Sequence, residues 1–484
     1  MPSQSVLVIG GGLAGLSCAV ALAEAGIRVC LVEKRPHLGG RATSYTLPDG
    51  SEVDNCQHVT LGCCTNLADF YRRAGAARQV HFYDTLYFAD RRGRRWTMRS
   101  WPLPPPLHMA PSFAFFGALN FADKRGIARA LLHVARNGGA PRVSAGLSML
   151  EWLQAMRQTP AAIERYWRVV LVSALDEELD RTDARYGIDV FWKAFLANRE
   201  GYRVGIPSVP LAELYEGCRE AVIKRGGEVR LRAGVREIRV RENCFAGAVL
   251  EDGTELTSDA CIAAVPHDVL LDMLPEEMSA AGGALEGVRQ LRTSPITGVH
   301  LWFDRTVMTQ PFLTLLDHKT QWVFNKTLLS QAAGSNEVAP ANVKEARGQY
   351  LQLVISASYD FVKLGRQEII ELCRKELAEV LPATREAQLV KSTVIKEINA
   401  TFSPAPGVDR FRPAQDMGVK NLFLAGDWTR TGWPSTMEGA VRSGYLASEA
   451  LLAAWGKPGK ILQPDLPAGG FCKIWAAHKK EEET

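Results

Sequence analysis

The sequence predicts an α/β fold built around a nucleotide-binding unit, and three observations support this class. A short apolar run, residues 5–9 (SVLVI), is followed at once by three glycines. An apolar helical pattern then covers residues 13–25 and ends at Gly26, and a second apolar run covers residues 28–32. An acid, Glu33, ends that second run. Strand, helix and strand in this order form one βαβ unit of a parallel sheet.

The glycines between the first strand and the helix have the spacing of a dinucleotide site. Gly10 allows a tight turn, Gly12 lets the backbone approach a pyrophosphate, and Gly15 lets helix and strand pack closely. The helix N-terminus then offers free N–H groups and a partial positive charge to the phosphates. We expect Glu33 to accept hydrogen bonds from the ribose. Gly39-Gly40-Arg41, a few residues later, is expected to supply a second phosphate contact.

The other end of the chain indicates that the dinucleotide is a flavin. Residues 421–425 (NLFLA) predict a buried strand that Gly426 and Asp427 terminate. Ser435 and Glu438 have the spacing of a capping box and predict the start of a helix. A helix N-terminus aimed at the flavin would stabilise the negative charge of its reduced ring, and Asp427 could bind a ribityl hydroxyl.

Together these motifs resemble the amine oxidase and phytoene desaturase superfamily. The resemblance implies an α/β chain with a glutathione-reductase-like FAD-binding Rossmann domain and an inserted α+β substrate domain. It implies FAD as the cofactor, held without a covalent bond because no cysteine lies between Cys373 and Cys472. The expected FAD contacts are Gly10, Gly12, Leu13, Ala14, Gly15, Glu33, Lys34, Gly40, Arg41, Val235, Gly426, Asp427, Ser435, Thr436 and Met437.

The same resemblance gives a domain division. The FAD-binding domain is expected to be discontinuous, and the ranges assigned to it are 1–60, 207–265 and 405–455. The substrate domain is expected to cover residues 61–206 and 266–404, and residues 456–484 are expected to be a C-terminal tail. Within the FAD-binding domain, strands are expected at residues 228–240, 245–250 and 255–264.

Two segments resemble one family more closely, the squalene-associated FAD-dependent hydroxysqualene dehydroxylases of hopanoid biosynthesis. They are residues 54–58 (DNCQH) and residues 425–444 (AGDWTRTGWPSTMEGAVRSG). This resemblance implies that reduced FAD converts hydroxysqualene to squalene, and that the partner is a squalene-type lipid. Loss of the hydroxyl group needs a proton donor, and His58 and Asp54 are the candidates. The physiological electron donor is not assigned.

Three alternatives stay open. A carotenoid or diapophytoene-type desaturase would use the same flavin in the oxidative direction, and the residues do not fix that direction. An amine oxidase would need a polar amine pocket with an aromatic cage. A non-catalytic FAD-binding escort protein would need neither a reaction direction nor an amine pocket. The presence of the motifs for both ends of the flavin argues against this alternative.

The bulk composition excludes several classes. The net charge of +4 is too weak for a nucleic-acid partner. The ten cysteines contain no C-x-x-C pair, so no metal site is expected, and reduced thiols in a cytoplasmic protein are the expectation. The N-terminus lacks the basic region of a signal peptide, and no apolar run is long enough to span a bilayer.

Residues 101–121 (WPLPPPLHMAPSFAFFGALNF) contain aromatics and prolines without a charged side chain other than a histidine. Phe115 and Phe116 are expected to line the substrate cavity, as is Trp433. Five arginines precede the stretch: Arg91, Arg92, Arg94, Arg95 and Arg99. Two interpretations stand side by side. The region contacts a membrane surface peripherally, or residues 90–95 form an exposed hairpin turn and the apolar stretch is cavity wall.

Overall fold

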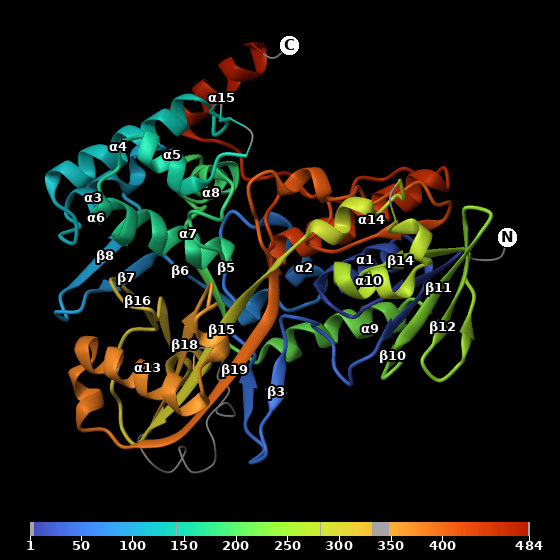
Figure 1. Ribbon diagram of the computed structural model, residues 1–484, viewed down its shortest axis with the longest axis horizontal. Helices are drawn as coiled ribbons and strands as arrows, with labels where there is room; N and C mark the ends of the chain where they lie inside the picture. Colours follow the sequence, from blue (N-terminus) through green and yellow to red (C-terminus); the bar gives the residue numbers. More distant parts are fainter. Residues whose placement is uncertain (1–3, 142, 145, 281, 332–347, 483–484) are drawn as a thin grey trace.

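A five-stranded parallel sheet forms the first half of the fold (Figure 1). The computed structural model describes residues 4–141, 143–144, 146–280, 282–331 and 348–482. The strand order is β10-β2-β1-β14-β20, with every pair parallel. The strands are β10 (Glu228–Leu231), β2 (Arg28–Glu33), β1 (Ser5–Ile9), β14 (Ala260–Ala263) and β20 (Leu422–Leu424). The α/β class and the N-terminal βαβ unit are confirmed.

Three helices pack with this sheet: α1 (Leu13–Glu24), α9 (Glu216–Lys224) and α14 (Met437–Ala454). Strands covered on both faces read as continuous apolar runs, which explains the sequences of β1 and β2. Helices α1 and α14 touch closely at Gly444, where an added Cβ would lie 2.2 Å from the Ser17 hydroxyl oxygen. The small residues of α14 therefore bring it against α1.

A three-stranded antiparallel sheet follows β10, with β11 (Val235–Arg241), β12 (Cys244–Leu250) and β13 (Glu255–Leu256). The single strand expected over residues 228–240 is wrong. Arg232 has a left-handed φ of 56°, which turns the chain between β10 and β11. The expected strand over residues 255–264 is likewise two strands, because β14 belongs to the parallel sheet.

A seven-stranded, mostly antiparallel sheet forms the second half of the fold. Its order is β19 (Leu389–Phe402), β15 (Thr293–Phe303), β18 (Gln349–Ile355), β17 (Trp322–Asn325), β16 (Phe312–Leu315), β7 (Thr85–Ala89) and β8 (Arg95–Arg99). Helix α13 (Arg366–Val380) packs its apolar side on this sheet, as Figure 1 shows. Strands β7 and β8 form the expected hairpin, with its turn at residues 90–94.

Helices gather at the end of this sheet away from α13 (Figure 1). They are α3 (Ala110–Ala114), α4 (Phe121–Arg136), α5 (Met149–Ala155), α6 (Pro160–Ala162), α7 (Arg168–Leu175) and α8 (Ala184–Val190). Helices α2 (Thr65–Arg73), α10 (His267–Met273) and α11 (Lys326–Gln331) belong to other parts of the chain. One small sheet pairs β3 (Ser44–Thr46) with β4 (Glu52–Asp54). Another has the strand order β5 (Thr60–Leu61), β9 (Val204–Pro207) and β6 (Val80–Tyr83).

The stretch expected to be a tail contains a packed helix, α15 (Gly470–Glu482). Its Cys472 is buried and its thiol donates to the Leu196 carbonyl oxygen at 3.4 Å, so α15 is held against the helical region. Within the described residues, no helix combines the length and the apolarity that crossing a bilayer requires.

Candidate active site

The glycine turn after β1 is held by Glu33 from the end of β2. One carboxylate oxygen of Glu33 accepts from the Gly11 N–H at 2.6 Å, and the other accepts from the Arg35 N–H at 2.8 Å. Gly10 has a φ of +108°, and a Cβ on Gly15 would lie 1.9 Å from the Gly10 carbonyl oxygen. Glycine is required at both positions so that α1 can begin directly against the turn.

Helix α1 begins at Leu13 with Gly12 as its N-cap, and neither a capping side chain nor an acidic first turn satisfies its N–H groups. Gly12 faces Gly40, since a Cβ on Gly12 would be 3.8 Å from the Gly40 Cα. The Gly39 N–H donates to the Gly11 carbonyl oxygen at 2.9 Å and fixes the two glycine loops together. The result is a backbone cradle with unsatisfied donors, which suits an anionic pyrophosphate.

Asp427 connects the two ends of the chain. Its carboxylate accepts from the Arg41 guanidinium and from the Ser435 hydroxyl. Burial alone would raise the pKa of Asp427, but Arg41 and Ser435 outweigh it and hold the pKa below its usual range. Asp427 therefore stays ionised, and its ion pair with Arg41 joins the loop after β2 to the loop after β20.

The expected capping box at Ser435 and Glu438 is wrong. Helix α14 begins at Met437, and Thr436 is its N-cap, accepting from the Gly439 N–H at 3.0 Å. The Ser435 hydroxyl donates a hydrogen bond to the Asp427 carboxylate instead of capping the helix. The Glu438 carboxylate accepts from the Leu67 N–H at 2.7 Å at the start of α2. Glu438 therefore caps a neighbouring helix rather than its own.

A cavity of about 400 Å³ runs along these loops. It lies within the size range of ligand pockets, roughly 300–1,000 Å³. The expected FAD contacts that line it are Gly10, Gly12, Leu13, Ala14, Glu33, Lys34, Gly40, Arg41, Val235, Gly426, Asp427, Ser435, Thr436 and Met437. Gly15 is the exception, because it packs against Gly10 beneath the cavity. The cradle, the ion pair and the helix N-terminus fit a molecule with a central pyrophosphate.

A second cavity of about 240 Å³ adjoins the first. Residues that line both cavities are Gln57, Val59, Ser173, Ala174, Val354, Ser356, Thr436 and Met437. Its other walls are mainly apolar and include Leu61, Leu86, Phe88, Met98, Phe116, Tyr166, Val169, Trp322, Phe324 and Trp433. Trp433 and Phe116, two of the three residues expected to line the substrate cavity, are among these walls. Phe115 is not, because its side chain is 81% exposed.

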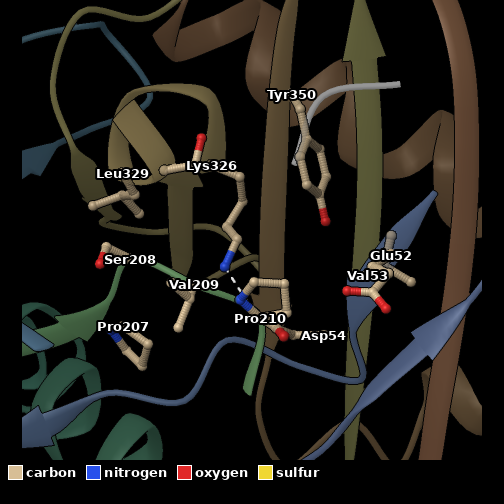
Figure 2. A pocket seen from close by; sticks show the side chains of 11 residues that line it. Glu52, Val53, Asp54, Pro207, Ser208, Val209, Pro210, Lys326, Leu329 and Tyr350 are labelled. Carbon is tan, nitrogen blue, oxygen red and sulfur yellow. Dashed lines mark hydrogen bonds and ion pairs between the residues drawn. The ribbon is translucent and has the colours of Figure 1, made fainter. Parts of the chain in front are cut away.

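The two predicted acid residues lie in different places. His58 lines the first cavity, and its Nδ1 lies 3.0 Å from the Cys56 carbonyl oxygen. Asp54 lies behind the cavity wall in a small separate pocket with Lys326 and Tyr350 (Figure 2). Burial would raise the pKa of Asp54, but Lys326 and the Leu211 N–H outweigh it and hold the pKa below its usual range. An ionised Asp54 outside the cavity does not donate a proton to a substrate.

Sequence reasoning did not single out Asp176, which also lines the first cavity. Asp176 ends α7 in a left-handed conformation, with a φ of 52°. Its carboxyl group accepts from the Ala357 N–H at 2.7 Å and from the Thr401 hydroxyl at 3.0 Å. Burial raises its pKa well above the usual range, and these hydrogen bonds offset only part of that effect. The first acid of a short acidic run, directly after an apolar helix, is the sequence signal that could have found it.

Residues 13–452 match the family of flavin containing amine oxidoreductases, and the chain belongs to this family. The protein is an FAD-dependent oxidoreductase, as the resemblance implied. Among solved structures, the fold resembles an oxidoreductase from Methanosarcina mazei, with a TM-score of 0.71, 18% identity, and coverage of 91% of this chain and 99% of that one. It also resembles cyclohexylamine oxidase from Brevibacterium oxydans, with a TM-score of 0.66, 16% identity, and coverage of 94% and 100%.

Several relatives in sequence carry the names of carotene desaturases. The chain is 27% identical to zeta-carotene desaturase of Synechocystis sp., over 93% of this chain and 97% of the relative. It is 28% identical to the zeta-carotene desaturase of Arabidopsis thaliana, over 94% and 86%. It is 26% identical to a 15-cis-phytoene desaturase from an Oncidium hybrid cultivar, over 93% and 78%.

These relatives contradict the expected reduction of hydroxysqualene to squalene. They carry desaturase names over nearly the full chain, which favours the oxidative alternative. The prediction was wrong because residues 54–58 and 425–444 line or support the flavin site, and a flavin site is common to both directions of reaction. The general acid that dehydroxylation would require has no place in a desaturation.

Proposed function

We propose that this chain is an FAD-dependent desaturase of long isoprenoid hydrocarbons of the carotene type. The observation that carries the proposal is the apolar cavity that adjoins the cofactor cavity and shares eight wall residues with it. Its aliphatic and aromatic walls suit a hydrocarbon chain, which needs no polar partner for recognition. The desaturase relatives support the same substrate class.

FAD would be held by the backbone cradle at Gly12 and Gly40 and by the loops that Arg41 and Asp427 join. Its N5 supplies a hydride acceptor in the oxidised state. Forming a C=C bond removes a hydride from one carbon and a proton from its neighbour. The chain must therefore offer the hydrocarbon a dry, shaped cavity and a site that accepts the proton.

His58 is the residue we infer to accept that proton. A carbonyl oxygen only accepts, so Nδ1 of His58 must carry the hydrogen that points at Cys56. Nε2 then keeps its lone pair. Desolvation lowers the pKa of His58, so the ring is neutral at pH 7 and free to take up a proton. We therefore infer that His58 accepts a proton, whereas it was expected from the sequence to donate one.

The test is an anaerobic mixing experiment with the oxidised, FAD-loaded protein. Phytoene or zeta-carotene should bleach the flavin absorbance in a single turnover, and the product should absorb at longer wavelength because its conjugation is extended. Putrescine and cyclohexylamine serve as amine controls and should leave the flavin oxidised. Flavin bleaching by an amine but by neither hydrocarbon would overturn the proposal in favour of an amine oxidase.

A further inference from the structure

Positive charge is concentrated in one part of the sequence. Residues 91–150 contain ten lysines and arginines and a single acid, Asp123. Their formal net charge is +9, while the whole chain carries +4, so the rest of the chain is net negative by 5. Asp123 is buried and caps the start of α4, which removes it from the surface. Apart from the buried Asp123, the lysines and arginines of this segment are therefore its only charged side chains.

The same part of the chain exposes large apolar side chains. Phe115 and Phe121 are 81% and 82% exposed, the highest values among the large apolar residues that the structure describes as exposed. Others nearby in sequence or in contact are Trp101, Leu103, Leu107, Leu132, Phe471 and Ile474. Scattered single apolar residues are ordinary on a protein surface, but a group of exposed apolar side chains of this size is typical of a binding surface.

These residues lie on elements that touch one another. The Lys124 ammonium of α4 donates to the Ala114 carbonyl oxygen of α3 at 2.7 Å. The Phe471 N–H at the start of α15 donates to the Pro105 carbonyl oxygen at 3.0 Å. The Trp101 indole N–H donates to the Ser112 hydroxyl of α3 at 3.2 Å. Figure 1 places α3, α4 and α15 together at one end of the molecule. We call this surface the α3–α4 face.

Cations surround the apolar side chains on this face. On α4, the exposed residues recur at helical spacing and include Phe121, Arg125, Arg129, Leu132 and Arg136. The cations of the face are Arg99, Lys124, Arg125, Arg129, Arg136 and Lys473. Within the described part of the chain, none of these six forms a salt bridge, so their charge is not cancelled by acidic neighbours.

The face also adjoins the apolar cavity. Phe115 points to solvent, and the next residue, Phe116, lines the cavity wall together with Met98 of β8. Trp101 follows β8 by two residues and carries the Arg99 guanidinium 5.8 Å from its ring centre. An apolar ligand that leaves a lipid phase at this face would therefore have to cross little more than the α3 segment to reach the cavity.

We propose that the α3–α4 face docks on an anionic lipid bilayer. Phe115 and Phe121 enter the boundary between headgroups and acyl chains, and the arginines of α4 contact the lipid phosphates. This is the arrangement that interfacial helices adopt when one side is apolar and its rim is basic. The proposal concerns a surface rather than a reaction, and it stands or falls separately from the desaturase assignment.

A flotation experiment with the FAD-loaded full chain and no substrate tests this. Wild-type protein should float with phosphatidylcholine vesicles that contain phosphatidylglycerol, and much less with pure phosphatidylcholine. The Phe115→Ser/Phe121→Ser variant should partition at least tenfold more weakly. The matched control is Ile223→Ser/Ile398→Ser, which removes two side chains that are 50% and 58% exposed elsewhere, and it should bind like wild type. Arg125→Gln/Arg129→Gln/Arg136→Gln should lose the preference for anionic vesicles.

Hydrogen exchange on the unmodified protein gives a second measurement that no folding defect can affect. Anionic vesicles should slow exchange in peptides that cover residues 107–125 and leave peptides from α9 unchanged. The proposal is overturned if wild-type protein does not float with anionic vesicles, if the phenylalanine variant binds as the control does, or if protection falls elsewhere.

Discussion

Lys326 and Asp54 form an ion pair enclosed by protein, with 2.8 Å between the ammonium nitrogen and a carboxylate oxygen. Lys326 also donates to the Gln57 side-chain oxygen at 3.0 Å, and Gln57 lines both cavities. The pair therefore lies directly behind the wall where the cofactor cavity and the apolar cavity meet. Neither charged group faces the cavities, so the expected role of the pair is structural.

Replacing Lys326 with Met should destabilise the protein strongly, because it leaves the Asp54 carboxylate buried without a partner. Removing one partner of a buried ion pair costs roughly 3–5 kcal/mol. Thermal unfolding of the FAD-loaded protein measures the loss. The double variant Asp54→Asn/Lys326→Met should recover much of it, and Lys319→Met, which breaks an exposed pair with Asp360, should change stability by about 0.5 kcal/mol at most. A double variant as unstable as Lys326→Met would contradict this account.

Replacing Gly12 with Val should remove FAD without unfolding the chain. A Cβ on Gly12 meets no atom closer than 3.8 Å, so the added bulk enters the cofactor cavity rather than the core. Flavin absorbance after gel filtration measures occupancy, and circular dichroism measures the fold. Gly459→Val, at a position with no atom within 4 Å, is the control. Retention of full flavin content by Gly12→Val would remove the glycine turn from the FAD site.

Replacing Glu33 with Ala should weaken FAD binding and also loosen the glycine turn. The carboxylate accepts from the Gly11 N–H, and a hydrogen bond to a charged group contributes about 1.5–3 kcal/mol. Titration of the apoprotein with FAD, followed by flavin fluorescence, measures affinity. Unchanged affinity would mean that the ribose contact expected for Glu33 is not made.

Asp176 should make the stability of the protein depend on pH. Its folded pKa is raised, so its stabilising contribution is fully present below the unfolded pKa, about 3.9, and is lost as pH rises through the folded value. Asp176→Asn stays neutral and can still accept from the Ala357 N–H. The variant should therefore be more stable than wild type at pH 8 and gain little at pH 4, with each unit of pKa difference worth about 1.4 kcal/mol. Urea unfolding of both proteins at both pH values measures this. The same stability difference between variant and wild type at pH 4 and at pH 8 would refute the prediction.

Replacing His58 with Ala should slow desaturation by roughly 10²–10⁴-fold if His58 accepts the substrate proton. FAD content should be nearly unchanged, since the His58 ring bonds the Cys56 carbonyl oxygen, whereas the cradle at Gly12 and Gly40 is built from backbone groups. Stopped-flow measurement of flavin bleaching by zeta-carotene separates the two effects. A parallel loss of flavin would make His58 a residue of the cofactor pocket, and normal bleaching would remove it from the reaction.

The nucleotide-binding end could be predicted from sequence because its signals are local. The turn at Gly10, the helix beginning at Leu13 and the acid at Glu33 lie within one βαβ unit, so neighbouring residues are enough to predict them. All but one of the expected cofactor residues line one cavity for this reason. The cap of the helix that begins at Met437 was predicted wrongly. Asp427 binds the Ser435 hydroxyl that was expected to cap this helix, and no local pattern shows that contact.

The substrate end depended on contacts that no local pattern encodes. Lys326 and Asp54 are 272 positions apart, so their pairing is invisible before folding. Phe115 and Phe116 are chemically identical neighbours at the end of a short helix, and only tertiary packing decides which one faces the cavity. The direction of the reaction could not be derived either, because a flavin accepts or donates a hydride in the same surroundings.

The strand order of the parallel sheet has a consequence for how the protein is made. Strands β1 and β2 lie within the first 33 residues, whereas β20, which completes the sheet beside β14, comes from residues 422–424. A ribosome working at about 5–20 residues per second needs roughly 20–80 s between the two. In the last part of that interval, once residues 260–263 have been made, β14 has an unpaired edge, and the loop bearing Asp427 does not yet exist. Flavin capture is therefore a late event in biosynthesis, and the unfinished sheet is the part of the nascent chain most in need of protection from aggregation.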